Sequence, residues 1–107
     1  MKEIYSVKEI DSMREEETKI IRKEIHFEGD VQGVGFRYRA KYAANGCGVT
    51  GWVKNEWDGS VWMEAQGTDR QINEMLRIIN ESPYIRIRNL NHHEIPLEEY
   101  ESGFHVR

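Results

Sequence analysis

The sequence predicts one α+β domain in which two helices cover one face of an antiparallel sheet. The chain has 107 residues, enough for one hydrophobic core but too few for two independent ones. Segments in which apolar and polar residues alternate, as in half-buried strands, lie around two segments whose apolar residues recur every three or four positions, as in helices. The order along the chain is strand, helix, strand, strand, helix, strand, with a short strand at the end. This order predicts a ferredoxin-like sandwich.

The first strand and the first helix lie on either side of a glycine-rich segment. Alternation over residues 20–27 predicts a strand with one apolar face. The helix is predicted over residues 36–45, because Asn45 and the glycine after it tolerate the left-handed conformation of a C-cap. Its buried side is expected to consist of Phe36, Ala40, Ala43 and Ala44. Tyr38 and Tyr42, one turn apart, are expected to be partly buried against the sheet.

The second half of the domain begins with a hairpin. Its strands are predicted over residues 49–54 and 60–66, joined by a turn rich in Asn, Asp and Gly. Thr68 and Gln71 have the spacing of a helix capping box. The helix that follows is expected to bury Ile72, Met75, Leu76 and Ile79 and to stop at Pro83. The last two strands are predicted over residues 84–90 and 103–107. A solvated acidic stretch is expected at Glu98, Glu99 and Glu101.

Residues 1–19 are predicted to be a charged extension outside the domain, which spans residues 20–107. Apolar residues recur every third position in this extension, which is a weak helical pattern. They are Ile4, Val7, Ile10 and Met13. We expect a monomer, and a dimer formed through this extension is the alternative.

Composition excludes several classes of function. The net charge of −4 does not favour binding to a nucleic acid. The sequence has neither an apolar run of the ~18 residues that a membrane span needs nor a signal peptide, so we expect a cytoplasmic protein without a membrane partner. A single cysteine, Cys47, excludes an internal disulfide and a cysteine-based metal cluster.

The glycine-rich segment between the first strand and the first helix is the first feature with chemical content. Gly29, Gly33 and Gly35 permit conformations in which successive backbone N–H groups point inward and bind an anion. The positive end of the following helix points to the same place. Arg37 lies in the first helical turn, where the helix dipole disfavours a cation unless an anion is bound nearby. The alternative is a plain turn with a solvated arginine.

Three other glycine-rich motifs do not fit. A dinucleotide-binding loop would need a glycine at Tyr38, and a Walker loop would need Gly-Lys followed by Ser or Thr. The segment over residues 32–38 is superficially similar to the aromatic RNP1 strand of RNA-recognition motifs, which share this order of elements. RNP1 lies on the third strand of that fold, however, whereas this segment precedes the first helix.

Two long motifs resemble the signatures of the acylphosphatase family. Gly29-Asp-Val-Gln-Gly-Val-Gly-Phe-Arg37 is similar to its phosphate-binding loop, and Gly51-Trp-Val-Lys-Asn-Glu-Trp-Asp-Gly-Ser-Val61 to its second signature. The resemblance extends over residues 20–107 and includes the order of the elements. One departure is Asp30, at a position that is often basic or neutral in the family, and its carboxylate is expected to point to solvent.

The resemblance implies an enzyme that hydrolyses acyl phosphates to a carboxylate and inorganic phosphate, without a metal or a cofactor. It assigns phosphate binding to Arg37 and to the loop amides of Gln32, Gly33, Val34 and Gly35. It assigns the orientation of the attacking water to Asn55, whose amide can accept from water while donating to a phosphate oxygen. The alternative is a non-catalytic phosphate-binding or regulatory domain that keeps the loop but has no turnover.

Overall fold

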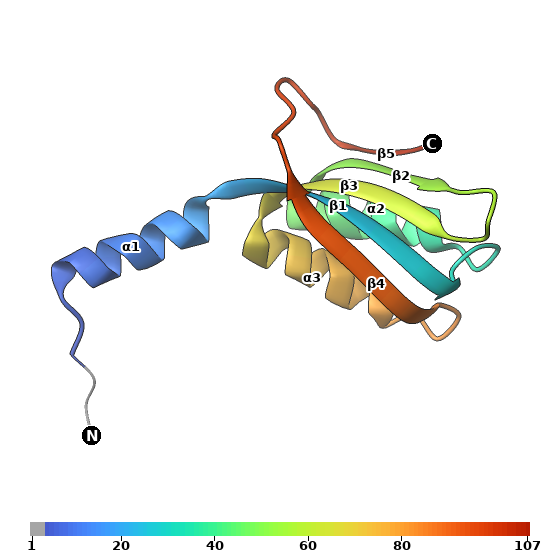
Figure 1. Cartoon of the computed structure of the whole chain (residues 1–107), viewed down its shortest axis with the longest axis horizontal. Coiled ribbons are helices and arrows are strands. Elements are labelled where there is room, and N and C mark those ends of the chain that lie inside the picture. The colour runs from blue at the N-terminus through green and yellow to red at the C-terminus, as the bar shows by residue number, and fades with distance from the viewer. Residues whose placement is uncertain (1–3) are drawn as a thin grey trace.

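The computed structural model is a five-stranded sheet with two helices on one face and a third helix that projects from the domain (Figure 1). It describes residues 4–107, with side chains for residues 4–12 and 17–107, so the predicted apolar position at Met13 lies outside the described side chains. The elements are α1 (Val7–Thr18), β1 (Ile20–Asp30), α2 (Phe36–Cys47), β2 (Thr50–Asn55), β3 (Val61–Thr68), α3 (Asp69–Asn80), β4 (Arg86–Ile95) and β5 (Phe104–Val106). The predicted ferredoxin-like fold is confirmed.

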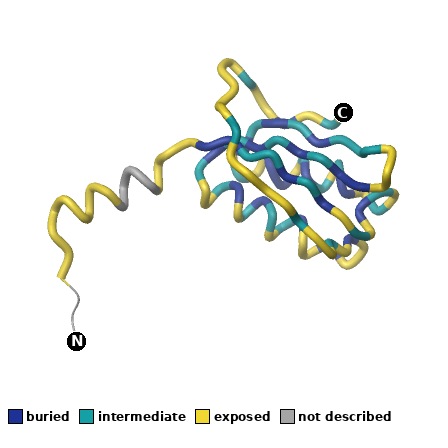
Figure 2. Tube along the Cα trace, in the orientation of Figure 1, coloured by how far each residue is buried: buried dark blue, intermediate teal, exposed yellow. Residues whose placement is uncertain are grey.

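The strand order in the sheet is β4-β1-β3-β2-β5. β1 pairs antiparallel with both β3 and β4, and β2 pairs antiparallel with β3. The short terminal strand β5 instead joins the edge of the sheet parallel to β2. Buried residues of β1 and β3 form a continuous core with α2 and α3 (Figure 2). The sheet therefore has one apolar, helix-covered face and one polar face.

Both predicted helices are present, and their buried faces are largely as expected. The four predicted core residues of α2 are buried, as are Ile72, Met75 and Ile79 of α3, whereas Leu76 is only partly buried. The predicted capping box at the start of α3 is confirmed, with the Gln71 backbone N–H donating to the Thr68 hydroxyl at 3.1 Å. The predicted end of α2 is wrong by two residues: the helix continues to Cys47, and Gly48 provides the left-handed C-cap.

Two expectations about burial are wrong. Tyr38 and Tyr42 are 60% and 73% exposed rather than packed on the sheet. Each is two positions from the buried Ala40, and two residues rotate a helix by about 200°, to its opposite side. Glu101 is not solvated, because its carboxylate pairs with the buried guanidinium of Arg22 on the polar face of the sheet. Glu98 and Glu99 are exposed as expected.

The predicted bounds of the fourth strand are also wrong. β4 begins at Arg86 and continues to Ile95, so Tyr84 precedes it and is exposed. The final strand lies within its predicted range.

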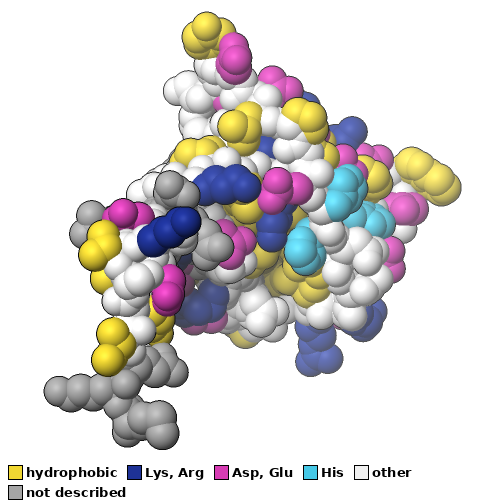
Figure 3. Space-filling view, turned by 60° about the vertical axis from the view of Figure 1, so that its left-hand side comes forward, with side chains coloured by type: hydrophobic (Ala, Val, Ile, Leu, Met, Phe, Trp, Pro, Cys, Tyr) yellow, Lys and Arg dark blue, Asp and Glu magenta, His cyan; other side chains and the backbone are white. Residues whose placement is uncertain are grey.

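The helix α1 is the part of the predicted extension that has regular structure. It begins at an N-cap, Ser6, whose hydroxyl accepts from the Glu9 backbone N–H at 3.1 Å. The Ser-x-x-Glu spacing is a sequence signal for this helix. No helix of the described residues is long and apolar enough to cross a membrane. Figure 3 shows acidic and basic side chains interspersed over the visible face of the protein.

Candidate active site

A small hollow at the N-terminal end of α2 brings together most of the residues predicted to bind phosphate and water. It has a volume of about 140 Å³. Its lining consists of Val31, Gly33, Gly35, Phe36, Arg37, Tyr38 and Asn55. Four predicted site residues, from the loop, the helix and the hairpin, thus face one space. Gln32 and Val34 do not line this hollow.

The loop that forms the hollow is fixed at both ends by buried residues. Val31 and Phe36 are almost fully buried, and the Phe36 ring packs edge-on against Phe27 with the ring centroids 4.8 Å apart. Just before the loop, at the end of β1, the backbone lies so close to β4 that a Cβ on Gly29 would lie 2.1 Å from the Arg86 carbonyl oxygen. Only glycine fits there, so this position of the motif is required by the packing of β1 on β4.

The N-terminus of α2 is open to an anion. Its N-cap, Gly35, has the left-handed conformation (φ 78°), and no side chain of the described residues caps the helix. The first amides of a helix have no partner within the helix, and together with the helix dipole they favour a negative charge. The first turn contains no acidic residue, and α2 as a whole carries three basic residues and no acidic one. These amides therefore point into an electropositive space.

The guanidinium of Arg37 lies at this end of the helix and is only partly engaged. Its Nη1 donates to the main-chain carbonyl of Arg107 at 3.1 Å. A guanidinium has five N–H donors in a planar fork, so one such bond leaves donors for two oxygens of a phosphate. The contact with Arg107 limits where this fork can point.

Asn55 is the last residue of β2 and lies opposite Val61 in the hairpin. Its Oδ1 is buried and has no hydrogen-bond partner among the described residues. A buried polar atom without a partner costs about 1–3 kcal/mol, so such an atom points to a bound water or ligand group. The unpaired oxygen belongs to the same residue that was predicted to hold the attacking water.

The loop and the hairpin are connected by the side chain of Gln32. Its Nε2 donates to the carbonyls of Glu56 and Ser60, at 2.7 and 2.8 Å. The hairpin turn is ordered in its own right, because Ser60 donates from both its backbone and its hydroxyl to Asp58. These bonds hold the pKa of the Asp58 carboxyl below its usual value. Gln32 therefore fixes the distance between the two halves of the site.

The charged groups near the loop do not form a metal site. Among the described residues, no three His, Cys, Asp or Glu side chains are grouped so that they could hold a metal ion. Asp30, the departure from the family pattern, is half exposed and pairs with Arg88 at 3.1 Å, away from the hollow. Its carboxylate thus points to solvent as expected.

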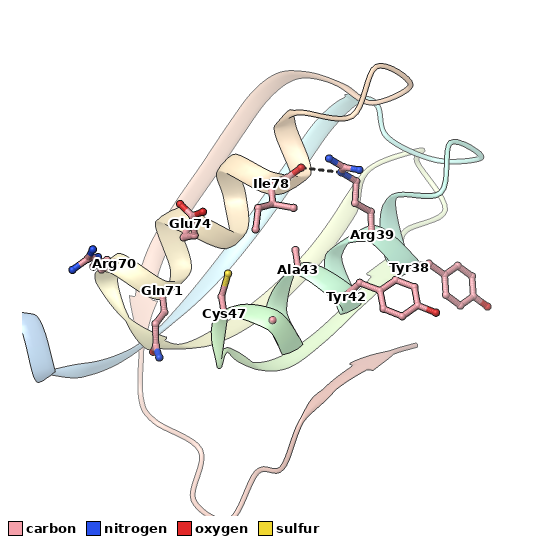
Figure 4. A pocket seen from close by; sticks show the side chains of 10 residues that line it. Tyr38, Arg39, Tyr42, Ala43, Cys47, Arg70, Gln71, Glu74 and Ile78 are labelled. Carbon is pink, nitrogen blue, oxygen red and sulfur yellow. Dashed lines mark hydrogen bonds between the residues drawn. The ribbon is translucent and has the colours of Figure 1, made fainter.

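A second, larger hollow lies between α2 and α3 (Figure 4). Its volume is about 830 Å³, and its walls are mainly apolar. It is lined by Tyr38, Arg39, Tyr42, Ala43, Gly46, Cys47, Arg70, Gln71, Glu74 and Ile78. Burial raises the pKa of the Cys47 thiol, and the Glu74 carboxylate raises it further, so this thiol is a poor nucleophile.

Comparisons with known proteins show the family of this chain. The family model for acylphosphatase matches residues 23–106. The chain belongs to the acylphosphatase family. It is 42% identical over 74 residues to an acylphosphatase of Lactiplantibacillus plantarum, covering 67% of this chain and 82% of that one. Relatives of this kind identify the chain as an acylphosphatase enzyme.

Solved acylphosphatases have the same fold. The structure from Bacillus subtilis has a TM-score of 0.75 and 29% identity, covering 83% of this chain and 99% of that one. The structure from Coxiella burnetii has a TM-score of 0.74 and 35% identity, covering 82% and 93%. In this acylphosphatase both signature motifs line the hollow at the start of α2.

Sequence reasoning missed two contacts at this site. The side chain of Gln32 connects loop and hairpin, whereas the sequence pointed only to its backbone amide. The sequence does contain a signal for this contact, because Gln32 is a long polar side chain among the glycines and valines of the loop. The Arg107 carbonyl that holds Arg37 is 70 residues away in sequence and is a backbone group, so no sequence pattern could identify it.

Proposed function

We propose that this enzyme cleaves the carboxyl–phosphate bond of acyl phosphates by direct attack of water, without a metal. Arg37 and the amides of residues 32–35 bind the phosphate group, and Asn55 orients the water. The observation that carries the proposal is the unpaired Oδ1 of Asn55 in the same hollow as Arg37 and the open N-terminus of α2. Acceptor and donors thus face one small space.

The reaction needs little more than positioning and charge stabilisation. An acyl phosphate carries a good leaving group, because the departing carboxylate is a weak base. Water attacks phosphorus in line, the P–O bond to the carboxylate breaks, and the proton of the water passes to solvent or to the phosphate product. Donors aimed at the equatorial oxygens stabilise the transition state. We assign these donors to Arg37 and the loop amides.

Asn55 links the water to the phosphate. Its Oδ1 accepts a hydrogen bond from the attacking water, and its amide nitrogen donates to a phosphate oxygen. Binding alone requires Arg37 and the loop. Hydrolysis of the bound phosphate additionally requires Asn55.

The test compares Arg37→Ala and Asn55→Ala in hydrolysis of benzoyl phosphate. Each variant should lose about 10²–10³ in rate, as expected for removal of one group that stabilises the transition state. Arg37→Ala should also weaken inhibition by inorganic phosphate strongly, whereas Asn55→Ala, which removes one neutral donor, should weaken it much less. Lys41→Ala, on the same helix, is the matched control for a lost positive charge. Wild-type turnover in either site variant would refute the role given to that residue.

The second candidate is a phosphate-binding domain without turnover. It keeps the open helix terminus and Arg37, which alone would suffice for binding. A phosphate titration beside the benzoyl phosphate assay separates the two: binding with no hydrolysis by the unmodified chain favours this candidate.

We also propose that residues 20–107 carry the activity as a cytoplasmic monomer. Support comes from the family match at residues 23–106 and from α1, which projects from the domain (Figure 1). A chain that lacks residues 1–19 should keep its kcat and KM within about twofold, since surface changes away from a site have small effects. Light scattering should give a single-chain mass for both versions. A dimer formed only by the longer chain would instead assign assembly to the extension.

A further inference from the structure

An arginine on the polar face of the sheet is buried as completely as the core. Arg22, on β1, is 1% exposed. Its Nε donates to Glu64 on β3 at 2.8 Å, and its Nη1 and Nη2 donate to the two carboxylate oxygens of Glu101 at 2.8 and 3.1 Å. Nη1 also donates to Gln66 at 3.2 Å. A guanidinium that makes four such bonds is costly to bury, so the network adds little net stability and acts by holding the chain in one arrangement.

The arrangement that this network specifies is the path of residues 96–103, which we call the strap. The strap crosses from β4 at one edge of the sheet to β5 at the other (Figure 1). Near its middle, Arg22 binds Glu101, and the side-chain amide of Gln66 makes two bonds to the backbone of Glu98, at 2.9 and 3.1 Å. Thr50 also bonds to Glu101, and a ring nitrogen of His105 lies 2.7 Å from the Ser102 carbonyl oxygen. The strap is otherwise largely exposed.

The strap leads directly into the strand that contacts the active site. β5 has only three residues, and a strand this short is weak without support at its ends. Its start is held by the Gly51 N–H, which donates to the Gly103 carbonyl at 3.1 Å, and its end by the Arg107 N–H, which donates to Val53 at 2.8 Å. The Arg107 carbonyl is the group that accepts from Arg37.

We infer that Arg22 is a positioning residue for catalysis, which fixes the strap through Glu101 and so holds the Arg107 carbonyl against Arg37. The inference rests on the proposed phosphate-binding role of Arg37. Arg22 lines neither hollow, so its effect passes through β5. The chain of contacts joins two guanidinium groups that belong to different faces of the molecule.

The ionisation of Glu101 agrees with this arrangement. Burial alone would raise its pKa, but the hydrogen bond from Arg22, a bond with Thr50 of β2 and the charges of Arg22 and His105 outweigh burial and lower it. Glu64 faces the same guanidinium from β3. The pKa of Glu101 in the folded protein is below its ordinary value of 4.5. The stability that the ionised Glu101 contributes is therefore fully present above pH 4.5 and is lost as the pH falls through the folded pKa.

The test uses Glu101→Gln and Arg22→Lys, which keep side-chain size and are milder than truncation. The first readout is hydrogen exchange of the Arg107 amide, which is independent of activity. We expect the Arg107 amide to exchange at least about tenfold faster. The amides that pair β1 with β3 in the sheet should stay protected. Arg77→Lys is the matched control, because Arg77 also joins two glutamates but on the exposed face of α3.

The second readout is inhibition by inorganic phosphate. Its inhibition constant and the KM should rise about tenfold, the size expected when one hydrogen bond to a charged group is loosened, with kcat changed less. In an Arg37→Ala background, Arg22→Lys should have no further effect on phosphate. Unchanged exchange at Arg107 in both variants would overturn the inference, as would faster exchange with unaltered phosphate binding. If Arg37→Ala itself binds phosphate normally, the proposed function fails, whatever the exchange data show.

Discussion

The two hollows beside α2 differ in size and in chemistry, and the smaller one has the features of an active site. The hollow between α2 and α3 has about six times the volume, at about 830 against about 140 Å³. Two of its polar side chains are paired: the Arg39 Nε donates to the Ile78 carbonyl, and the Gln71 side chain accepts from the Thr68 N–H in the capping box. Its walls are mainly apolar.

The smaller hollow contains hydrogen-bonding groups that have no partner. The helix terminus has no side-chain cap, and the Asn55 Oδ1 has no partner among the described residues. A phosphate and one water are small, so a catalyst for their reaction needs convergent donors and acceptors more than it needs volume. Unsatisfied polar groups, rather than size, therefore distinguish the candidate active site.

The largest expected effect comes from a change of charge in the smaller hollow. Asn55→Asp keeps the shape of the side chain but replaces the amide donor by a carboxylate that faces the phosphate. We expect a loss of at least about 10²-fold in kcat/KM for benzoyl phosphate, together with weaker inhibition by inorganic phosphate. Asn55→Ala removes the donor without adding a charge, so it should weaken phosphate inhibition less than Asn55→Asp does.

The pair of Asn55 variants also separates two roles of this residue. If both variants bind phosphate equally well, the side chain does not face the anion and acts on the water alone. A wild-type rate in Asn55→Asp would move the catalytic centre away from this hollow.

A smaller effect is expected where the loop is joined to the hairpin. Gln32→Ala leaves the Glu56 carbonyl without its side-chain donor and weakens the fixed distance between the loop and Asn55. We expect a loss of about 1–3 kcal/mol in the free energy of unfolding, and roughly a tenfold lower kcat. Urea unfolding and benzoyl phosphate kinetics measure the two quantities. Asn73→Ala, which removes an exposed hydrogen bond on α3, is the control.

Most of the fold could be predicted because local patterns and packing agree. The capping box of α3 and the buried positions of α2 are set by residues close together in sequence. The burial of Glu101 could not be predicted because its partner, Arg22, is 79 residues away, and nothing near either residue signals the pairing. The parallel addition of β5 to β2 is likewise a long-range property.

In the candidate site, too, some features could be predicted from local sequence and others depend on long-range contacts. The residues of the two motifs meet in one hollow because each motif lies at a defined point of its element, the loop before α2 and the end of β2. The contact between Arg37 and the Arg107 carbonyl depends on where the last strand lies, and the bonds of Gln32 depend on the spacing between loop and hairpin. Such contacts follow from the tertiary structure and not from either motif.

The smallest effects are expected from substitutions of the two exposed tyrosines. These substitutions test the two hollows against each other. Tyr38 lines both hollows, whereas Tyr42 lines only the larger one. Tyr42→Ala should therefore leave kcat and KM within about twofold of wild type, because an exposed side chain outside the site contributes little. Tyr38→Ala should raise the KM for benzoyl phosphate a few-fold, about the value of one aromatic contact, and that for acetyl phosphate less. Equal effects of both variants on benzoyl phosphate would mean that the acyl group extends into the larger hollow, and that the enzyme uses the two hollows together.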